Sequence, residues 1–251
     1  MARILVGTPA GRPPEWSFVH SLWGLEIGNH EVHFRAQPGY GGVDAACNAL
    51  CDHALDIDAD WFLLVASDAV FHPQTLARLL SWGVDAVAAL SFTRYGPMVP
   101  TVYIREERNR DGEPIFAIDH PVVLEWLQAH PELMQLNAPA VLEPRPEDAL
   151  LPVLRFGTHL SLYSREVLET TGPGWFTRQN EDGSGEDFAF VAKIARAGFQ
   201  PYVDLSVVGG HLWGDWAITP LDYMIWAQST DWRRHEVVIK LGGRDAKDQQ
   251  G

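Results

Sequence analysis

The chain has 251 residues, of which 46% are hydrophobic, and its formal net charge is −14. This length and hydrophobic content can bury a substantial core, so we expect one folded domain over residues 1–243, followed by a disordered tail at 244–251. The negative charge argues against a broad electrostatic surface for nucleic acid, although it leaves room for a local basic groove. No apolar run approaches about 18 residues, so we expect no membrane-spanning helix.

Hydrophobic runs and turn residues alternate along the chain as they do where strands and helices follow one another. In chain order, the pattern predicts a strand at Ile4–Val6, a helix at Trp16–Ile27, a strand at Val32–Phe34, a helix at Asp44–Leu55, a strand at Trp61–Val65, a helix at Pro73–Leu80 and a strand at Asp85–Phe92. Such alternation favours right-handed strand-helix-strand units, and therefore an α/β fold with a mostly parallel sheet.

Three segments are less regular. Residues 105–113 are charged, and Asp111 with Gly112 predicts a hairpin or an exposed loop there. Residues 137–152 carry several prolines among acidic residues. We expect both segments to be surface excursions that cover the binding cleft. The segment after Gly172 has the composition of a long loop, and such loops in compact domains are often lids.

The chain's two cysteines, Cys47 and Cys51, lie one helical turn apart. Such a pair can ligate a metal ion, but no second pair of Cys or His residues accompanies it. Two packed free thiols are therefore the favoured interpretation. Free thiols and the absence of a signal peptide predict a cytoplasmic protein.

The candidate catalytic and metal-binding residues lie at the ends of predicted strands and helices. Asp68 follows the apolar run Trp61–Val65, Glu186 and Asp187 open a predicted helix, and His211 lies just beyond a short predicted strand. If Trp61–Val65 is a buried strand, the Asp68 carboxylate emerges at the carboxyl edge of the sheet, where open α/β sheets bind ligands. We therefore expect these side chains, which come from distant parts of the chain, to meet in one cleft.

Each of these residues also has a purely structural explanation. Asp68 can start a turn, which is the common role of Asp after a strand. Glu186 and Asp187 suit a helix N-terminus capped by Ser184. A lone histidine such as His211 is usually buried and satisfied by a backbone carbonyl. The preceding Gly209–Gly210 instead favours function, because glycines let the backbone approach a ligand closely.

The order of these segments resembles that of nucleotide-sugar-dependent glycosyltransferases of the GT-A fold. The matching segments are Arg3–Pro9, Cys47–Leu50, Trp61–Leu80, Gly157–His159, Ser164–Leu168, Pro173–Phe176, Gly185–Asp187 and His211. The resemblance implies a Rossmann-like GT-A domain whose central sheet is flanked by helices. It also implies a nucleoside-diphosphate sugar as donor, a UDP-sugar first of all, and Mn²⁺ or Mg²⁺ as cofactor. Small relatives without a membrane anchor occur in bacteria and their viruses.

Two positions depart from the family's pattern. The first Asp of the Asp-X-Asp motif falls on Ala66, so only the last Asp is present, as Asp68. In relatives the last Asp is usually the direct metal ligand and the first more often contacts the sugar or ribose. The resemblance thus keeps metal binding and changes donor-sugar recognition. Cys47 stands where relatives often carry an Arg, which alters the nucleotide pocket.

The resemblance also implies a role for each candidate residue. Asp68 and His211 would hold the metal ion, and Asp187 rather than Glu186 would be the base of an inverting transfer. Glu186 would instead contact the acceptor or the loop. The donor would contact Thr8, Pro9, Asp44, Asn48, Ser67 and Arg94. The acceptor site would be lined by His159, Trp175 and Trp213, with the indoles suited to stacking.

Three classes of function follow. The leading one is an inverting, metal-dependent glycosyltransferase acting on a saccharide, a protein or a hydroxymethyl-pyrimidine base in DNA. The second is a non-catalytic protein of the same fold that binds a sugar nucleotide or a glycan, which the Ala66 departure motivates. The third is a sugar-phosphate nucleotidyltransferase, which needs a Gly-rich phosphate loop followed by Pro-Lys. The segment Gly7–Arg12 only vaguely resembles that loop, and the sequence has no downstream Pro-Lys.

Overall fold

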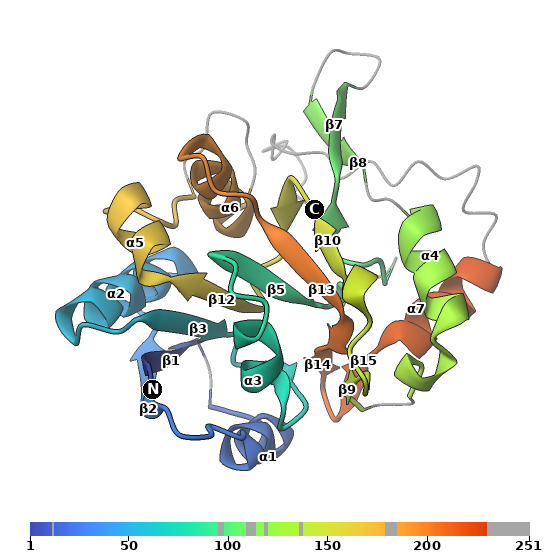
Figure 1. Cartoon of the computed structure of the whole chain (residues 1–251), viewed down its shortest axis with the longest axis horizontal. Helices are drawn as coiled ribbons and strands as arrows, with labels where there is room; N and C mark the ends of the chain where they lie inside the picture. The colour runs from blue at the N-terminus through green and yellow to red at the C-terminus, as the bar shows by residue number, and fades with distance from the viewer. Residues whose placement is uncertain are drawn as a thin grey trace, which may run out of the picture.

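The computed structural model describes residues 1–11, 13–94, 98–108, 114–117, 120–135, 138–178 and 185–229. Its centre is an eight-stranded sheet of order β10-β13-β5-β12-β3-β1-β2, with β9 paired to β13 (Figure 1). These strands are β1 (Arg3–Ala10), β2 (Glu31–Pro38), β3 (Trp61–Val65), β5 (Ala86–Leu90), β9 (Ala140–Val141), β10 (Leu150–Pro152), β12 (Leu160–Ser164) and β13 (Tyr202–Val208). Strands β1, β2, β3, β5 and β13 run one way, and β9, β10 and β12 run against them. The predicted mostly parallel sheet is confirmed.

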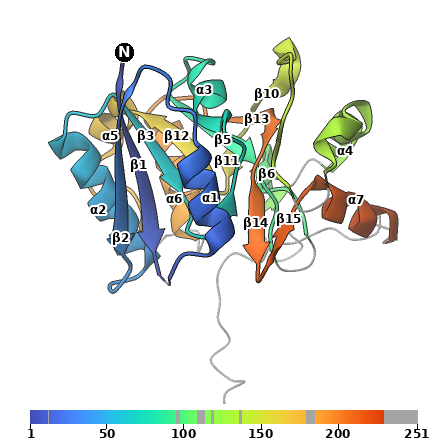
Figure 2. The ribbon, with the colours of Figure 1, turned by 90° about the horizontal axis from the view of Figure 1, so that it is seen from below.

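Helices cover both faces of this sheet, which gives three layers (Figures 1 and 2). One face packs against α2 (Val43–Asp56), α5 (Arg165–Thr171) and α6 (Glu186–Arg196). The other packs against α1 (Trp16–Gly24) and α3 (Thr75–Leu80). Helices α1, α2, α3 and α6 fall where the sequence predicts them, although α1 ends at Gly24 instead of Ile27 and α3 begins at Thr75 instead of Pro73, whereas α5 was not predicted.

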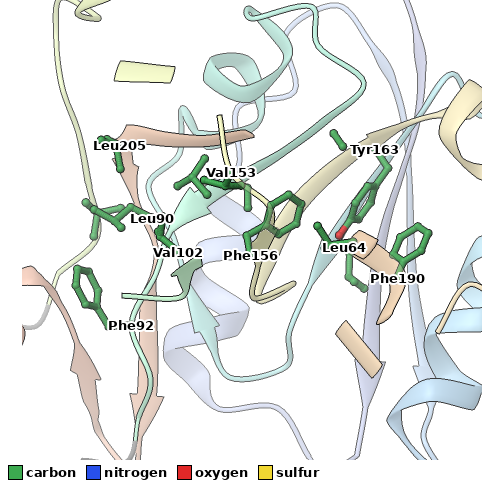
Figure 3. Packing of buried hydrophobic residues seen from close by; sticks show 14 of the residues in the cluster. Leu64, Leu90, Phe92, Val102, Val153, Phe156, Tyr163, Phe190 and Leu205 are labelled. Carbon is green, nitrogen blue, oxygen red and sulfur yellow. The ribbon is translucent and has the colours of Figure 1, made fainter. Parts of the chain in front are cut away.

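The core on the α2, α5 and α6 side is rich in aromatic rings. Figure 3 shows the rings of Phe156, Tyr163 and Phe190 near one another in the core. The ring centroids of Tyr163 and Phe190 are 5.0 Å apart, and those of Phe156 and Tyr163 are 6.3 Å apart. Cys47 and Cys51 belong to this core as buried free thiols, so the favoured interpretation of the pair is confirmed.

Shorter elements complete the fold. They are β4 (Ala69–Val70), β6 (Val102–Tyr103), β7 (Arg105–Arg108), β8 (Pro114–Ala117), α4 (His120–Ala129), η1 (Pro131–Leu133), η2 (Glu147–Ala149), β11 (Arg155–Phe156), β14 (Gly210–Trp213), β15 (Trp216–Ile218) and α7 (Pro220–Ser229). Strands β4, β14 and β15 form a small sheet, and β6 pairs with β11. No helix among the described residues is long and apolar enough to cross a membrane.

The irregular segments have different outcomes. Strands β7 and β8 pair antiparallel, which confirms a hairpin around the predicted turn. Residues 137–152 are not only a surface excursion: β9 and β10 both pair with β13 and extend the central sheet. Their backbone groups therefore satisfy the hydrogen bonding of an edge that would otherwise be open. The predicted cap Ser184, residues 179–184 of the predicted lid after Gly172 and the predicted tail at 244–251 lie outside the described residues.

Glycine determines how β14 approaches its neighbour. Gly210 faces Val70 of β4, and a Cβ atom on Gly210 would lie 2.6 Å from Val70 Cγ2 and 3.0 Å from Ala217 Cβ. Gly209 similarly faces Leu160, at 3.2 Å from an added Cβ. The predicted reason for these glycines needs correcting, because their close contacts are with neighbouring strands. They bring His211 to its position by strand packing.

We predict that Gly210→Ala displaces β14 and costs about 1–3 kcal/mol of the free energy of unfolding, the usual range for an overpacked core. The matched control is Gly24→Ala at the end of α1, where an added Cβ would meet only Pro73 at 3.8 Å. Urea denaturation of both variants measures the difference. Equal stabilities would contradict the packing role of Gly210.

Candidate functional site

A cleft of about 390 Å³ opens where β1, β3 and β5 end and where β12 and α6 begin. It is lined by Pro9, Val43, Cys47, Leu64, Ala66, Asp68, Thr93, Arg94, Thr101, Gly157, Thr158, His159, Glu186, Asp187 and His211. A second lobe of about 330 Å³ shares Pro9, Val43, Ala66, Asp68 and Arg94 with it and adds Gly11, Gly39 and Ser67. The residues predicted to meet in one cleft thus lie together at the carboxyl edge of the sheet.

Asp68 stands between the two lobes and is surrounded by basic side chains. Its Oδ2 accepts a hydrogen bond from the Arg94 guanidinium and lies 3.4 Å from His211 Nε2, while its Oδ1 lies 3.7 Å from His159 Nε2. Burial opposes ionisation, but the contacts with His211, His159 and Arg94 outweigh it and hold the pKa of Asp68 well below its usual range. Asp68 is therefore a carboxylate at any physiological pH.

His211 has one ring nitrogen fixed by the backbone. Its Nδ1 lies 3.0 Å from the carbonyl oxygen of Phe92, which can only accept, so Nδ1 carries a proton. Nε2 is then the ring nitrogen that faces Asp68. The sequence left open that His211 is a purely structural residue whose ring bonds to a backbone carbonyl. That explanation accounts for Nδ1 but not for Nε2. An N–H bonded to a backbone carbonyl is also the usual way in which a metal-binding histidine is oriented.

His159 is the buried member of this group. Its side chain is 9% exposed, and neither ring nitrogen has a hydrogen-bond partner among the described residues. Burial, together with repulsion from His211, lowers the pKa of His159 to about 3, so the imidazole is neutral. The sequence assigned His159 to the acceptor site, whereas its ring centroid is 4.2 Å from that of His211.

These three side chains fit a divalent metal ion. One ligand atom from each of Asp68, His159 and His211 lies within 4.8 Å of the others. Two features point to a cation: Asp68 Oδ2 and His211 Nε2 lie 3.4 Å apart with the His211 ring oriented by a carbonyl, and the unpartnered nitrogens of His159 carry an energetic cost in a buried position. A carboxylate with imidazoles suits Mn²⁺ and other transition ions.

Asp187 lines the same cleft, in the first turn of α6. Its Oδ1 accepts a hydrogen bond of 2.8 Å from the Phe188 N–H. Burial and the neighbouring charge of Glu186 outweigh this bond and raise the pKa of Asp187 to about 6. A carboxyl group with such a pKa can accept a proton and release it near neutral pH.

Glu186 and Cys47, which also line the cleft, are less suited to proton transfer at the same place. Glu186 also lines the cleft, but successive helical residues point about 100° apart, so the two carboxyl groups face different parts of it. Burial and the acidic residues nearby raise the pKa of Cys47 to about 12. The Cys47 thiol therefore stays protonated and is no nucleophile.

The residues predicted to contact the donor divide into two groups. Pro9, Ser67 and Arg94 line the second lobe. Thr8 is 5% exposed within β1, and Asp44 Oδ1 forms an ion pair of 2.8 Å with Arg178 Nε.

Asn48 departs most from its predicted role. Its amide donates to the Phe176 carbonyl at 2.8 Å and accepts from the Phe176 N–H at 3.0 Å. These two bonds make Asn48 a tie between α2 and the segment before α6.

The predicted acceptor residues also differ in position. Trp175 is 3% exposed in the core, and its indole N–H donates to the Leu168 carbonyl at 2.9 Å. The acceptor role predicted for Trp175 is therefore withdrawn. Trp213 is 54% exposed on β14, and in the ladder it faces Trp216, which is 40% exposed. Both lie on the same face of the hairpin as His211, because every second residue of a strand shares a face.

No protein-family model matches the chain, and a search of curated proteins finds no match either. Among solved structures, the chain is similar to A197 from STIV, with 16% identity, a TM-score of 0.56, and coverage of 87% of this chain and 90% of that one. It is also similar to GalNAc-T7 solved with UDP, GalNAc and Mn²⁺, with 11% identity and a TM-score of 0.50. That match covers 84% of this chain and spans 43% of the GalNAc-T7 chain. These likenesses confirm the predicted GT-A fold.

We predict that Asp187→Asn stabilises the protein at neutral pH. The native pKa of about 6 exceeds the ordinary value of 3.8, so the carboxyl group contributes less to stability as pH rises from about 4 to about 6. Asparagine keeps the acceptor for the Phe188 N–H and carries no charge. Relative to the native protein, the gain should therefore be small at pH 4 and reach up to about 3 kcal/mol above pH 6.

Thermal unfolding at pH 4, 5, 6 and 7 measures this difference. The matched control is Asp52→Asn, at an exposed position of α2. A stability gain for Asp187→Asn that does not grow with pH, or one shared by Asp52→Asn, would contradict the assigned pKa.

Proposed function

We propose that this protein is an inverting glycosyltransferase that moves a sugar from a nucleoside diphosphate to an acceptor hydroxyl. One observation carries the proposal: a single cleft is lined both by an Asp68–His211 pair fit for a metal ion and by the proton-accepting carboxyl group of Asp187. A glycosyl transfer needs both, because charge develops on the diphosphate while the acceptor hydroxyl loses its proton. The GT-A fold supports this interpretation by analogy.

The donor suits the second lobe of the cleft. Pro9 at the end of β1 and Gly39 after β2 provide a flat edge for the nucleotide base, and Ser67 and Arg94 stand where phosphates would lie. A UDP-sugar is the first donor to test, since GalNAc-T7, which shares the fold, was solved with UDP and Mn²⁺. We place the reaction in the cytoplasm, in keeping with the free thiols of Cys47 and Cys51.

Asp68 and His211 would hold the divalent ion, Mn²⁺ before Mg²⁺, and the ion would act as a Lewis acid on the diphosphate leaving group. The protein's own contribution is to orient these ligands. The Phe92 carbonyl fixes the ring of His211, and Arg94 both bonds to Asp68 and adds positive charge beside the phosphates.

Asp187 would remove the acceptor proton. With a pKa of about 6 it is mostly ionised at pH 7, yet basic enough to accept a proton as the acceptor oxygen attacks. The attack comes from the face of the sugar opposite the diphosphate, so the configuration at the anomeric carbon inverts. Such general-base catalysis contributes about 10²–10⁴ in rate.

The acceptor is a saccharide, a protein or a hydroxymethylated pyrimidine base in DNA. Trp213 lies two residues beyond His211 on β14, which is a distance of about 7 Å along the strand at its usual rise. An indole at that place offers a flat surface for a sugar ring or a base.

The alternative is a protein of the same fold that binds a sugar nucleotide or glycan without turnover. Ala66, at the position of the first Asp of the family motif, is the observation that favours it. The two functions differ in one measurable quantity, the release of free nucleotide after donor binding.

We predict that the purified protein with Mn²⁺ releases free nucleotide from one member of a panel of UDP- and GDP-sugars. Asp187→Asn should lower this turnover by at least about 10², because the base is lost, and should leave the dissociation constant of the donor unchanged. Glu186→Gln is the matched control and should raise the KM for the acceptor with little effect on kcat. Donor binding without release in the native protein supports the non-catalytic alternative. Near-normal turnover of Asp187→Asn rules out its role as base.

We predict that Trp213→Ala raises the KM for the acceptor at least fivefold, since stacking on an indole contributes about 1–3 kcal/mol. The control is Trp23→Ala on α1, whose indole is 75% exposed and lies outside the residues lining the cleft. Repeating the assay at 50 and 200 mM salt tells the acceptors apart, because a DNA acceptor makes phosphate contacts that weaken steeply with salt. An unchanged KM in Trp213→Ala would remove Trp213 from the acceptor site.

A further inference from the structure

The backbone sets His159 directly opposite Ala66. Strand β12 pairs antiparallel with β3, with Leu160 opposite Val65, and the Ala66 N–H donates to the His159 carbonyl at 2.8 Å. Residues opposite each other on antiparallel strands project to the same face, with Cβ atoms about 4.5–5.5 Å apart. The methyl group of Ala66 thus leaves room beside Asp68, and the neighbouring strand fills that room with an imidazole.

Burial of the His159 imidazole carries an energetic cost. Both nitrogens lack hydrogen-bond partners among the described residues, although the side chain is only 9% exposed. Replacing it by an apolar residue of similar size would remove that penalty. Yet its Nε2 lies 3.7 Å from Asp68 Oδ1, in the same cluster as His211 Nε2.

We infer that His159 is a third protein ligand of the metal ion, supplied by β12 at the place where β3 presents only Ala66. The inference rests on the proposed function, which assigns the ion to Asp68 and His211. It sets the chemistry of the site: two imidazoles and one carboxylate. Imidazole ligands favour Mn²⁺, Co²⁺ and Zn²⁺ over Mg²⁺, which prefers an all-oxygen shell.

His159→Leu tests the assignment through two effects of opposite direction. Metal affinity should fall at least about tenfold, since even the loss of an outer partner of a ligand costs about 10–100-fold. In EDTA, by contrast, the variant should unfold at the same or a higher temperature than the native protein, because two unpartnered nitrogens are gone. A residue with a merely structural role would lower the unfolding temperature and leave the affinity alone.

Titration of the full chain with Mn²⁺, followed by the electron paramagnetic resonance of the free ion, measures affinity without any nucleotide sugar. The visible absorption of bound Co²⁺ reports the coordination number and ligand field of the ion, so it should change when the His159 imidazole is lost. The matched control is His72→Leu, four residues beyond Asp68, where His72 Nδ1 accepts a hydrogen bond from the Gln74 N–H at 3.3 Å. His72→Leu should bind Mn²⁺ like the native protein.

A double variant, Ala66→Asp with His159→Leu, moves the third ligand back to β3. It should recover Mn²⁺ affinity relative to His159→Leu and bind Mg²⁺ more tightly than the native protein does. Native-like Mn²⁺ affinity and an unchanged Co²⁺ spectrum in His159→Leu would overturn the inference, while the pair Asp68 and His211 and the proposed function would stand. If the native protein binds no Mn²⁺, the inference also falls, and donor turnover in EDTA then decides the proposed function separately.

Discussion

The antiparallel insertion of β12 between β3 and β5 is the constraint on which the site depends. Its neighbours run the other way, so β12 starts at the edge of the sheet where they end. The residue just before β12, His159, therefore meets the residues just after β3 and β5, which are Asp68 and Arg94. A slip of one residue in this ladder would turn His159 to the opposite face of the sheet. The ladder thus fixes the cluster's geometry more firmly than any contact within it.

The surroundings of two carboxyl groups in the same cleft shift their pKa values in opposite directions. Asp68 contacts Arg94 and two histidines, so its pKa falls, whereas the half-buried Asp187 loses solvation beside the charge of Glu186, so its pKa rises to about 6. Such divergence separates roles: a permanently charged group suits a cation, and a group that titrates near neutrality suits proton transfer. A sequence motif alone does not define these two roles. Ala66 breaks the Asp-X-Asp motif, yet the pKa values of Asp68 and Asp187 still shift in opposite directions.

Prediction from sequence succeeded where local pattern controls structure. The run Trp61–Val65 is apolar because β3 is covered on both faces, and its end fixes where Asp68 emerges. It failed where contacts between distant segments decide. Trp175 lies in a Pro- and Gly-rich segment that is typical of a loop, yet α5 covers it. His159 and Ala66 could each be read in the sequence, but not the fact that they lie opposite each other. Pairing between distant strands leaves no local signal in the sequence.

The β14–β15 hairpin couples the two halves of the proposed reaction. It carries His211 near its base and the facing residues Trp213 and Trp216 at its tip. Asp222 of α7 accepts bonds from the Trp216 indole N–H at 3.2 Å and from the Thr219 N–H at 2.8 Å. The hairpin is thereby anchored to a helix on one strand and, through Gly210, to β4 on the other. The distance from His211 to the indoles follows from strand geometry, so an acceptor stacked there would be held at a fixed reach from the donor's diphosphate.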